Sequence, residues 1–260
     1  MTNEPRLVDK VALVFGGSRG IGAAIVKQLA ADGASVALTY AKSPDKAAET
    51  AHAAEALGVS AIMIKADSAD AEAVTDAVAQ TVARFGRLDI LVVASGKNQV
   101  AKIVDMQPAQ FLDIMDVNVT QSWLMARAAG AQMLKQGAGG KVVLMSSARG
   151  LLGHPAGYTA YCASKSAVDG ITKALGCEWG STGITVNALG PTVFRSPLTQ
   201  WMFDDTERAT EVRKGFLTRV PKGRLGEPAD LAGPLLFLAS KASDFYTGHI
   251  LYADGGYTAG

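Results

Sequence analysis

The sequence has little net charge and no long apolar run. Its 25 Lys and Arg residues nearly balance 24 Asp and Glu residues, so the formal net charge is +1. This balance provides no basic surface for nucleic acid or for an anionic membrane. No uncharged apolar run approaches the ~18 residues of a membrane-spanning helix, and the start, MTNEPRLVDK, lacks the apolar core of a signal peptide. We therefore expect a cytoplasmic protein that binds neither nucleic acid nor a membrane.

Cysteine and histidine are also scarce. Cys162 and Cys177 both fall in a helix expected at about 160–180. At ~1.5 Å per residue they would lie roughly 22 Å apart, whereas a disulfide needs α-carbons within about 7 Å. We expect two free thiols. The three histidines lie far apart, at His52, His154 and His249. No cysteine or carboxylate pair accompanies them, so we expect no metal site.

Apolar, strand-like runs alternate with alanine-rich segments of helical period. The strands are expected at 10–17, 34–40, 60–67, 88–96, 140–147, 184–190 and 249–256. The helices are expected at 20–32, 44–58, 70–86, 108–117, 119–136, 160–180 and 228–239. Continuous apolar strands flanked by helices are typical of a parallel sheet that is covered on both faces.

The pattern predicts an α/β fold in a single domain over residues 1–260. The expected architecture is a Rossmann-type, doubly wound parallel sheet of about seven strands, with right-handed crossovers and helices on both faces. The only long irregular segment is 191–227, which is rich in proline, aromatic and charged residues. Excursions of this kind are usually binding loops, so we predict that it contacts the substrate.

A glycine-rich turn follows the first expected strand. The stretch FGGSRGIG contains Gly16, Gly17, Gly20 and Gly22 and leads directly into a helix. Glycines in this position let the backbone approach a pyrophosphate at the positive end of the helix. The spacing is G-x-x-x-G-x-G rather than G-x-G-x-x-G. A tight turn could need glycine for its own geometry, but the strand before it and the helix after it favour dinucleotide binding.

Further motifs follow this turn in a fixed order. They are KAD (65–67), DVNV (116–119), VVLMSSARG (142–150), YCASK (161–165), VNALGP (186–191) and TGHILYADGG (247–256). Together with the glycine turn, this ordered set resembles the short-chain dehydrogenase/reductase family over essentially the whole chain. The resemblance implies a nicotinamide cofactor and the transfer of a hydride between that cofactor and an alcohol or a carbonyl.

The resemblance also implies a catalytic set of Asn118, Ser147, Tyr161 and Lys165. Tyr161 and Lys165 share one face of a helix because they are four residues apart. A phenol with an ordinary pKa near 10 is a poor base at neutral pH, and the nearby ammonium favours its ionised form. Ser147, rather than its neighbour Ser146, has the family's spacing to a glycine, and its hydroxyl would bind the substrate oxygen. In the family, an asparagine matching Asn118 holds a water that links Lys165 to solvent.

The resemblance further implies which residues contact the cofactor. They are Gly16, Ser18, Arg19, Gly20, Ile21, Gly22, Tyr40, Lys42, Asp67, Ser68, Ala94, Gly96, Lys165, Pro191, Thr192, Val193 and Ser196. Two departures from the family pattern stand out. The usual Asn-Asn-Ala-Gly is VASG here (93–96), and the usual Pro-Gly is Pro191–Thr192. Neither removes a chemical group that hydride transfer requires.

The end of the second strand predicts NADP(H) in preference to NAD(H). An NAD enzyme generally places a carboxylate there to hold the ribose 2′-hydroxyl. This sequence has Tyr40, Ala41 and Lys42 at that point, and Arg19 lies in the glycine turn. A guanidinium can grip a 2′-phosphate through two hydrogen bonds, and Lys42 could add a point charge.

The substrate is less well defined by the sequence. The pocket is expected from residues 97–102, 148–158 and 192–220, which are apolar and aromatic with a few cations. A small or cyclic ketone, a polyol, or a 3-oxoacyl thioester would suit it. A binding protein that has lost the chemistry is the lesser alternative. We expect Arg149 and Arg195 to be solvated, although either could meet an anionic substrate.

The resemblance also implies a homotetramer, paired through the long helices 108–136 and 158–180 and through the last helix and strand.

Overall fold

Seven parallel strands form one sheet at the centre of the structure. The computed structural model describes residues 6–260. The first half of the stretch MTNEPRLVDK, where we expect no signal peptide, lies outside the described residues. The strands are β1 (Val11–Phe15), β2 (Ser35–Tyr40), β3 (Ala61–Lys65), β4 (Ile90–Val93), β5 (Gly140–Met145), β6 (Ile184–Pro191) and β7 (Ile250–Ala253). Their order is β3-β2-β1-β4-β5-β6-β7, and every neighbouring pair is parallel. The order reverses between β1 and β4, which is where doubly wound sheets open a crevice for ligands.

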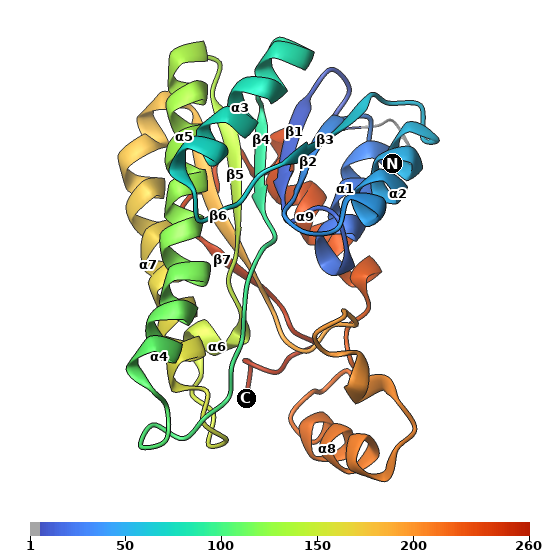
Figure 1. The fold of residues 1–260 in the computed structure, drawn as a ribbon, viewed down its shortest axis with the longest axis vertical. Helices are drawn as coiled ribbons and strands as arrows, with labels where there is room; N and C mark the ends of the chain where they lie inside the picture. Colours follow the sequence, from blue (N-terminus) through green and yellow to red (C-terminus); the bar gives the residue numbers. More distant parts are fainter. Residues whose placement is uncertain (1–5) are drawn as a thin grey trace.

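Helices cover both faces of this sheet (Figure 1). One face carries α1 (Gly20–Ala31), α2 (Pro44–Glu55) and α9 (Ala232–Ala239), and the other carries α3 (Ala71–Phe85), α5 (Gln121–Gln136) and α7 (Thr159–Trp179). Alternate strand residues serve the two faces, so Ala12 and Val14 pack on the first group while Leu13 and Phe15 pack on the second. The continuous apolar strands therefore reflect a sheet buried on both sides, and the predicted fold is confirmed.

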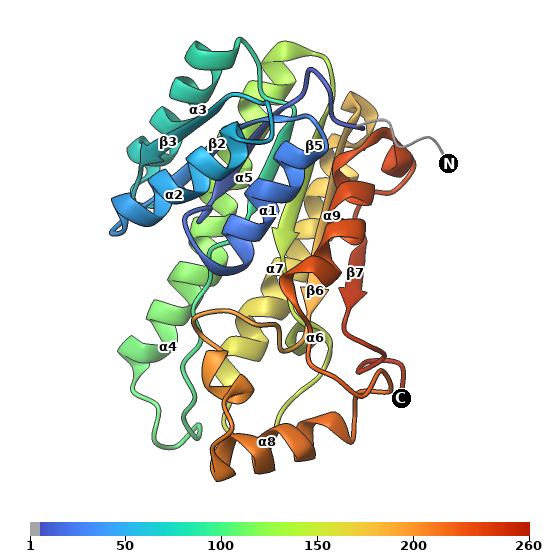
Figure 2. The ribbon, with the colours of Figure 1, turned by 90° about the vertical axis from the view of Figure 1, so that its right-hand side faces the viewer.

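Three further helices gather beyond the carboxyl ends of the strands, as Figure 2 shows. They are α4 (Pro108–Met115), α6 (Ala148–Leu151) and α8 (Glu207–Leu217). Helix α8 lies within the predicted substrate loop, which also contains a 3₁₀ turn at Gln200–Phe203. The segment 191–227 is thus less irregular than the sequence indicated. Remaining 3₁₀ turns lie at Gly180–Thr182, Pro228–Leu231 and Lys241–Ser243.

The two helices expected at 108–117 and 119–136 are one continuous helical run, which corrects that prediction. A π-helical turn, Asp116–Thr120, joins α4 directly to α5. No glycine or proline interrupts the sequence DVNVT, so nothing forces the helix to stop there. A π turn accommodates an additional residue by widening the helix, and such turns are frequent at functional sites.

Both cysteines lie on α7 and both are free, as predicted. Within residues 6–260, none of the helices combines the length and the apolar character needed to cross a bilayer. Over the same range, no three His, Cys, Asp or Glu side chains come together in a group that could hold a metal ion.

Candidate active site

The glycine turn forms a backbone cradle between β1 and α1. Gly16 has a positive φ of 76°, a conformation that side chains with a β-carbon rarely adopt. A β-carbon at Gly22 would collide with the Gly16 carbonyl oxygen, so the first turn of α1 packs directly on the loop. Thr39 fixes the loop from β2, because its hydroxyl accepts a hydrogen bond from the Gly16 amide at 3.2 Å. The N-terminal amides of α1 are left available for an anion.

This cradle borders a cavity of about 470 Å³ at the carboxyl edge of the sheet. All of the predicted cofactor residues line it except Thr192 and Val193. These two residues come directly after Pro191, the last residue of β6, and do not line the cavity. Tyr161 and Lys165 form part of the same wall. The cavity therefore connects the glycine cradle to the predicted catalytic pair.

The cavity offers backbone donors that suit a dinucleotide diphosphate. Backbone can approach the ligand closely at the glycine turn, and a helix N-terminus faces the same space. Ser95, which was not among the predicted residues, also lines the cavity, and its buried hydroxyl has no hydrogen-bond partner within residues 6–260. A buried hydroxyl without a partner is costly, and a bound ligand would satisfy it.

The end of β2 is cationic rather than acidic. Arg19 and Lys42 both line the cavity here, beside Tyr40. Among the salt bridges of residues 6–260, neither cation has a carboxylate partner. Asp67, which follows β3, is the acidic residue in the described lining, and its Oδ1 already accepts a hydrogen bond from the Ala69 amide at 3.0 Å.

Tyr161 and Lys165 lie one helical turn apart on α7, and the Lys165 ammonium is 5.6 Å from the centre of the Tyr161 ring. Lys165 is buried, and its Nζ donates a hydrogen bond to the Met145 carbonyl at 2.8 Å. Burial lowers the pKa of Lys165 to about 8, while the carboxylate of Asp169 acts in the opposite direction. Burial raises the pKa of Tyr161, and the Ser147 hydroxyl opposes that rise. The free protein therefore holds a protonated phenol.

The two candidate serines at the end of β5 have different partners. The Ser146 hydroxyl bonds to the buried Asp169 carboxylate, one turn beyond Lys165. Ser147 caps α6: its hydroxyl accepts a hydrogen bond from the Arg149 amide at 3.1 Å and donates one to the Pro191 carbonyl at 3.3 Å. Of the two serines, Ser147 is the one whose hydroxyl lowers the pKa of the Tyr161 phenol. Asp169 was not predicted, although its position four residues after Lys165 was a signal that could have identified it.

Asn118 lies buried in the π turn and connects three parts of the site. Its amide nitrogen donates to the Lys97 carbonyl and to the Ser164 hydroxyl, both at 2.9 Å, and its side-chain oxygen accepts from the Lys97 amide at 2.8 Å. The loop after β4 is thereby held against α7. The backbone carbonyl of Asn118 accepts a hydrogen bond from Ser122 at 2.7 Å, and a carbonyl oxygen can accept one more.

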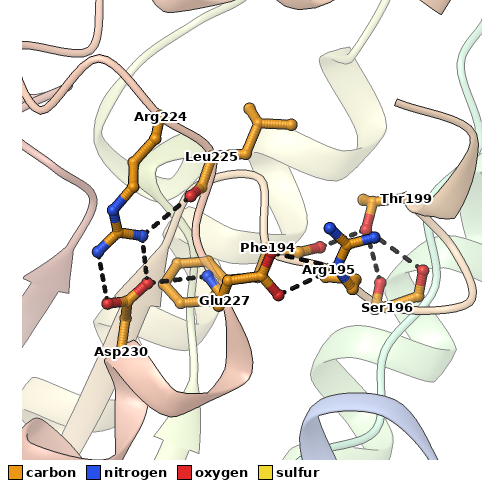
Figure 3. Close-up of polar contacts among 8 residues, drawn as sticks. All are labelled: Phe194, Arg195, Ser196, Thr199, Arg224, Leu225, Glu227 and Asp230. Carbon is orange, nitrogen blue, oxygen red and sulfur yellow. Dashed lines mark hydrogen bonds and ion pairs between the residues drawn. The ribbon is translucent and has the colours of Figure 1, made fainter. Parts of the chain in front are cut away.

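The two ends of the substrate loop are fastened together at its base (Figure 3). Phe194 and Gly226 form a parallel β-bridge, with the Arg195 amide donating to the Gly226 carbonyl at 2.9 Å. Arg195 forms an ion pair with Glu227 at 3.0 Å and lies 4.0 Å from the centre of the Phe203 ring. Arg195 is exposed to solvent, as expected from the sequence, and its charge is paired with that of Glu227.

Polar contacts extend this base on both sides. Arg224 forms two hydrogen bonds with Asp230, at 2.6 and 2.7 Å, and the arginine holds the pKa of that carboxyl down at about 2. On the opposite side Ser196, one of the predicted cofactor residues, shares a 2.8 Å hydrogen bond with the hydroxyl of Thr199.

Known proteins resemble this chain along almost its whole length. A family model described as "Enoyl-(Acyl carrier protein) reductase" matches residues 16–258. An uncharacterized oxidoreductase of Mycobacterium tuberculosis is 46% identical over 252 residues, covering 96% of this chain and 92% of the relative. The 3-oxoacyl-[acyl-carrier-protein] reductase of Staphylococcus aureus is 36% identical over 249 residues, covering 96% and 98%. A solved short-chain dehydrogenase/reductase of Serratia marcescens superposes with a TM-score of 0.90 at 36% identity, covering 97% and 99%.

Proposed function

The chain belongs to the short-chain dehydrogenase/reductase family and is an oxidoreductase, and from that premise we propose the finer activity. We propose that it transfers a hydride between NADP(H) and the carbonyl or secondary alcohol of a small or cyclic ketone or a polyol. The observation that carries this proposal is the position of Tyr161 and Lys165, one helical turn apart on α7, in the wall of the dinucleotide cavity.

Each catalytic side chain has a distinct task in this proposal. A bound nicotinamide dinucleotide supplies or accepts the hydride. Ser147 donates a hydrogen bond to the substrate oxygen as charge develops on it. Tyr161 gives its phenolic proton to that oxygen in reduction and takes it back in oxidation. Lys165 stabilises the phenolate through its positive charge.

Asn118 keeps Lys165 in place by joining the loop after β4 to α7. We propose that its backbone carbonyl also holds the water that returns protons to Lys165.

The cofactor preference rests on the cations at the end of β2. Arg19 and Lys42 line the cavity without a carboxylate partner among residues 6–260, and Tyr40 stands where an NAD enzyme generally has an acidic residue. A 2′-phosphate would meet one guanidinium and one ammonium there, with no carboxylate beside it at the end of β2. This arrangement supports NADP(H) over NAD(H).

Replacing Tyr161 with Phe tests the proposed chemistry. The variant should lose turnover of every ketone and alcohol that the wild-type protein uses, because the phenolic proton is gone, while the cofactor dissociation constant stays within about twofold. Tyr158, which is adjacent to Tyr161 at 6.4 Å between ring centres, provides the matched control. Tyr158→Phe should keep most of the turnover. If Tyr161→Phe also retains it, the proposed role is wrong.

A 3-oxoacyl-thioester reductase is the second candidate function, and the Staphylococcus aureus relative supports it. Assays with acetoacetyl thioesters and with simple cyclic ketones would separate the two candidates. Thioester-dependent oxidation of NADPH that exceeds the rate with cyclic ketones would favour this second function. A protein that binds the cofactor but reduces neither class would fit the lesser alternative of a binding protein.

We also propose that the protein is a cytoplasmic homotetramer. Leu112, Trp123 and Leu134, on the continuous helical run from α4 to α5, are large apolar side chains exposed to solvent. An interface between copies would cover them. Sedimentation that shows only a monomer would contradict the tetramer, and cell fractionation would test the location.

A further inference from the structure

The guanidinium of Arg149 lies over two aromatic rings, one of which neighbours the proposed catalytic tyrosine. Its Cζ atom is 5.9 Å from the centre of the Tyr158 ring and 5.2 Å from that of Tyr257. The Tyr158 ring is in turn 6.4 Å from the Tyr161 ring. A single ring, that of Tyr158, thus links the guanidinium to the proposed catalytic tyrosine. Neither Arg149 nor Tyr158 belongs to the lining of the dinucleotide cavity, so this group extends the site away from the cofactor.

Arg149 is held in place by two hydrogen bonds. Its Nη1 donates to the Gly153 carbonyl at 2.9 Å, and its Nη2 donates to the Tyr257 hydroxyl at 2.7 Å. Tyr257 is itself buried and stacks on Phe216 of α8 at 5.1 Å between ring centres. A guanidinium has five N–H donors, so the described residues leave three for a ligand. The side chain is ordered in advance, which reduces the entropy lost on binding. Arg149 is half-buried, so the expectation that it is solvated holds in part.

A second guanidinium adds positive charge to the same neighbourhood. The Cζ atom of Arg219 is 4.5 Å from the centre of the Tyr257 ring. Among the salt bridges of the described chain, neither Arg149 nor Arg219 is paired with a carboxylate. Arg195, at the base of the loop, differs because Glu227 neutralises it. Two unpaired guanidiniums close to one aromatic ring create a site of positive potential.

His154 adds a neutral donor to this cationic group. Its ring centre is 4.6 Å from that of Tyr158, and its Nδ1 accepts a hydrogen bond from the Ala156 amide at 3.1 Å. Burial lowers the pKa of His154, and the charges of Arg149 and Arg219 lower it further. The neutral ring therefore carries its proton on Nε2, where it can be donated.

We propose that Arg149, supported by Arg219, binds an anionic group of the substrate, a carboxylate or a phosphate. The reacting carbonyl or hydroxyl of the same molecule would meet Tyr161. This inference rests on the proposed oxidoreductase function and narrows its substrate class to oxo acids, hydroxy acids or phosphorylated ketones and alcohols. A planar guanidinium suits both anions, because it can donate two parallel hydrogen bonds to adjacent oxygens.

The test uses ketones that differ in one group. We would compare 4-oxocyclohexanecarboxylate with its carboxamide, and include 4-oxocyclohexyl phosphate as the second anion. For wild-type protein with NADPH, kcat/KM should be at least about 10-fold higher for an anionic ketone than for the carboxamide. Arg149→Gln should lower kcat/KM for the anionic ketones about 10- to 100-fold, mainly through KM. Its effect on the carboxamide should stay within about twofold.

Two further variants complete the comparison. Arg149→Lys keeps the positive charge but cannot donate two parallel hydrogen bonds. Its kcat/KM for the anionic ketones should therefore fall between those of wild type and Arg149→Gln. Arg84→Gln, on α3, removes an arginine that lies over the Phe85 ring and has no place in the site. It should change kcat/KM neither for the anionic ketones nor for the carboxamide. The relative rates with carboxylate and phosphate identify which anion the site prefers.

The outcomes separate the anion site from the chemistry. Equal losses for carboxamide and carboxylate in Arg149→Gln would show a structural role and overturn the proposal, as would a wild-type preference for the carboxamide. If no ketone is reduced, calorimetric binding of the carboxylate to the NADP⁺-loaded Tyr161→Phe variant gives a readout without turnover. Binding that is lost on adding Arg149→Gln would support the anion site although the proposed activity had failed. Absence of binding would overturn the anion site.

Discussion

Replacing Lys165 with Met should make the stability of the protein respond differently to pH. Lys165 is 3% exposed, and burial brings its pKa from 10.5 down to about 8. Such a change corresponds to about 3 kcal/mol by which the folded protein disfavours the charged lysine. Methionine has a similar length and no charge, so the variant lacks this cost. The active site thus contains a cation that opposes folding at neutral pH.

The pH window follows from the two pKa values of Lys165. Below pH 8 the side chain is protonated in the folded and the unfolded chain, and the folded protein bears the whole cost. Between pH 8 and 10.5 the unfolded chain binds more protons than the folded chain, so the free energy of unfolding of the wild type rises with pH. Relative to Lys165→Met, the wild type should gain about 2.5 kcal/mol between pH 7 and pH 10.

Urea denaturation at fixed protein concentration measures this difference at each pH. The loss of packing and of the hydrogen bond to the Met145 carbonyl shifts the variant by an amount that depends little on pH, so the change with pH is the informative quantity. Lys27→Met, at an exposed position of α1, is the matched control and should run parallel to wild type. If the difference between wild type and Lys165→Met stays constant from pH 7 to pH 10, the reasoning from burial is refuted.

Two other substitutions test the cofactor site and the packing. Arg19→Ala should weaken NADP(H) binding about tenfold or more, since a charge-assisted contact contributes ~1.5–3 kcal/mol. The same substitution should leave NAD(H) binding nearly unchanged. An equal loss for both cofactors, or an equal or better rate with NAD(H) in the wild type, would contradict the assignment. Gly130→Ala should lower the free energy of unfolding by about 1–3 kcal/mol, because a β-carbon there would run into the buried Trp179 ring. At Gly215 an added β-carbon would have no neighbouring atom within 4 Å, so Gly215→Ala should not lower the free energy of unfolding. Thermal melts would compare the two variants.

The sheet and its helices could be predicted because their signals are local. Each strand is a short apolar run, and each covering helix has its own period. The π turn at Asp116–Thr120 could not be predicted, because its widened hydrogen bonding depends on how Asn118 reaches Lys97 and Ser164 from other elements. Its sequence, DVNVT, is compatible with an ordinary helix boundary.

The site divides in the same way between local and distant contacts. Tyr161 and Lys165 could be paired from their spacing alone. Arg149 could not be placed, since the hydroxyl that holds it belongs to Tyr257, 108 residues later in the chain. The partner of Arg195 is likewise 32 residues away. The partners of such side chains cannot be predicted from the sequence, because only the fold brings them together.

The fastened base of the substrate loop makes the segment between its ends replaceable. The β-bridge of Phe194 with Gly226 and the ion pair of Arg195 with Glu227 bring the two ends together next to β6, whatever lies between them. Because the ends are already joined, doubling the length of a flexible insert would cost only about 0.6 kcal/mol of further closure entropy. Residues 197–223 can therefore change in length while the strands that position Ser147 and the cofactor cradle keep their geometry. Exchanging the whole segment would also replace Arg219 and Phe216, and with them part of the proposed anion site.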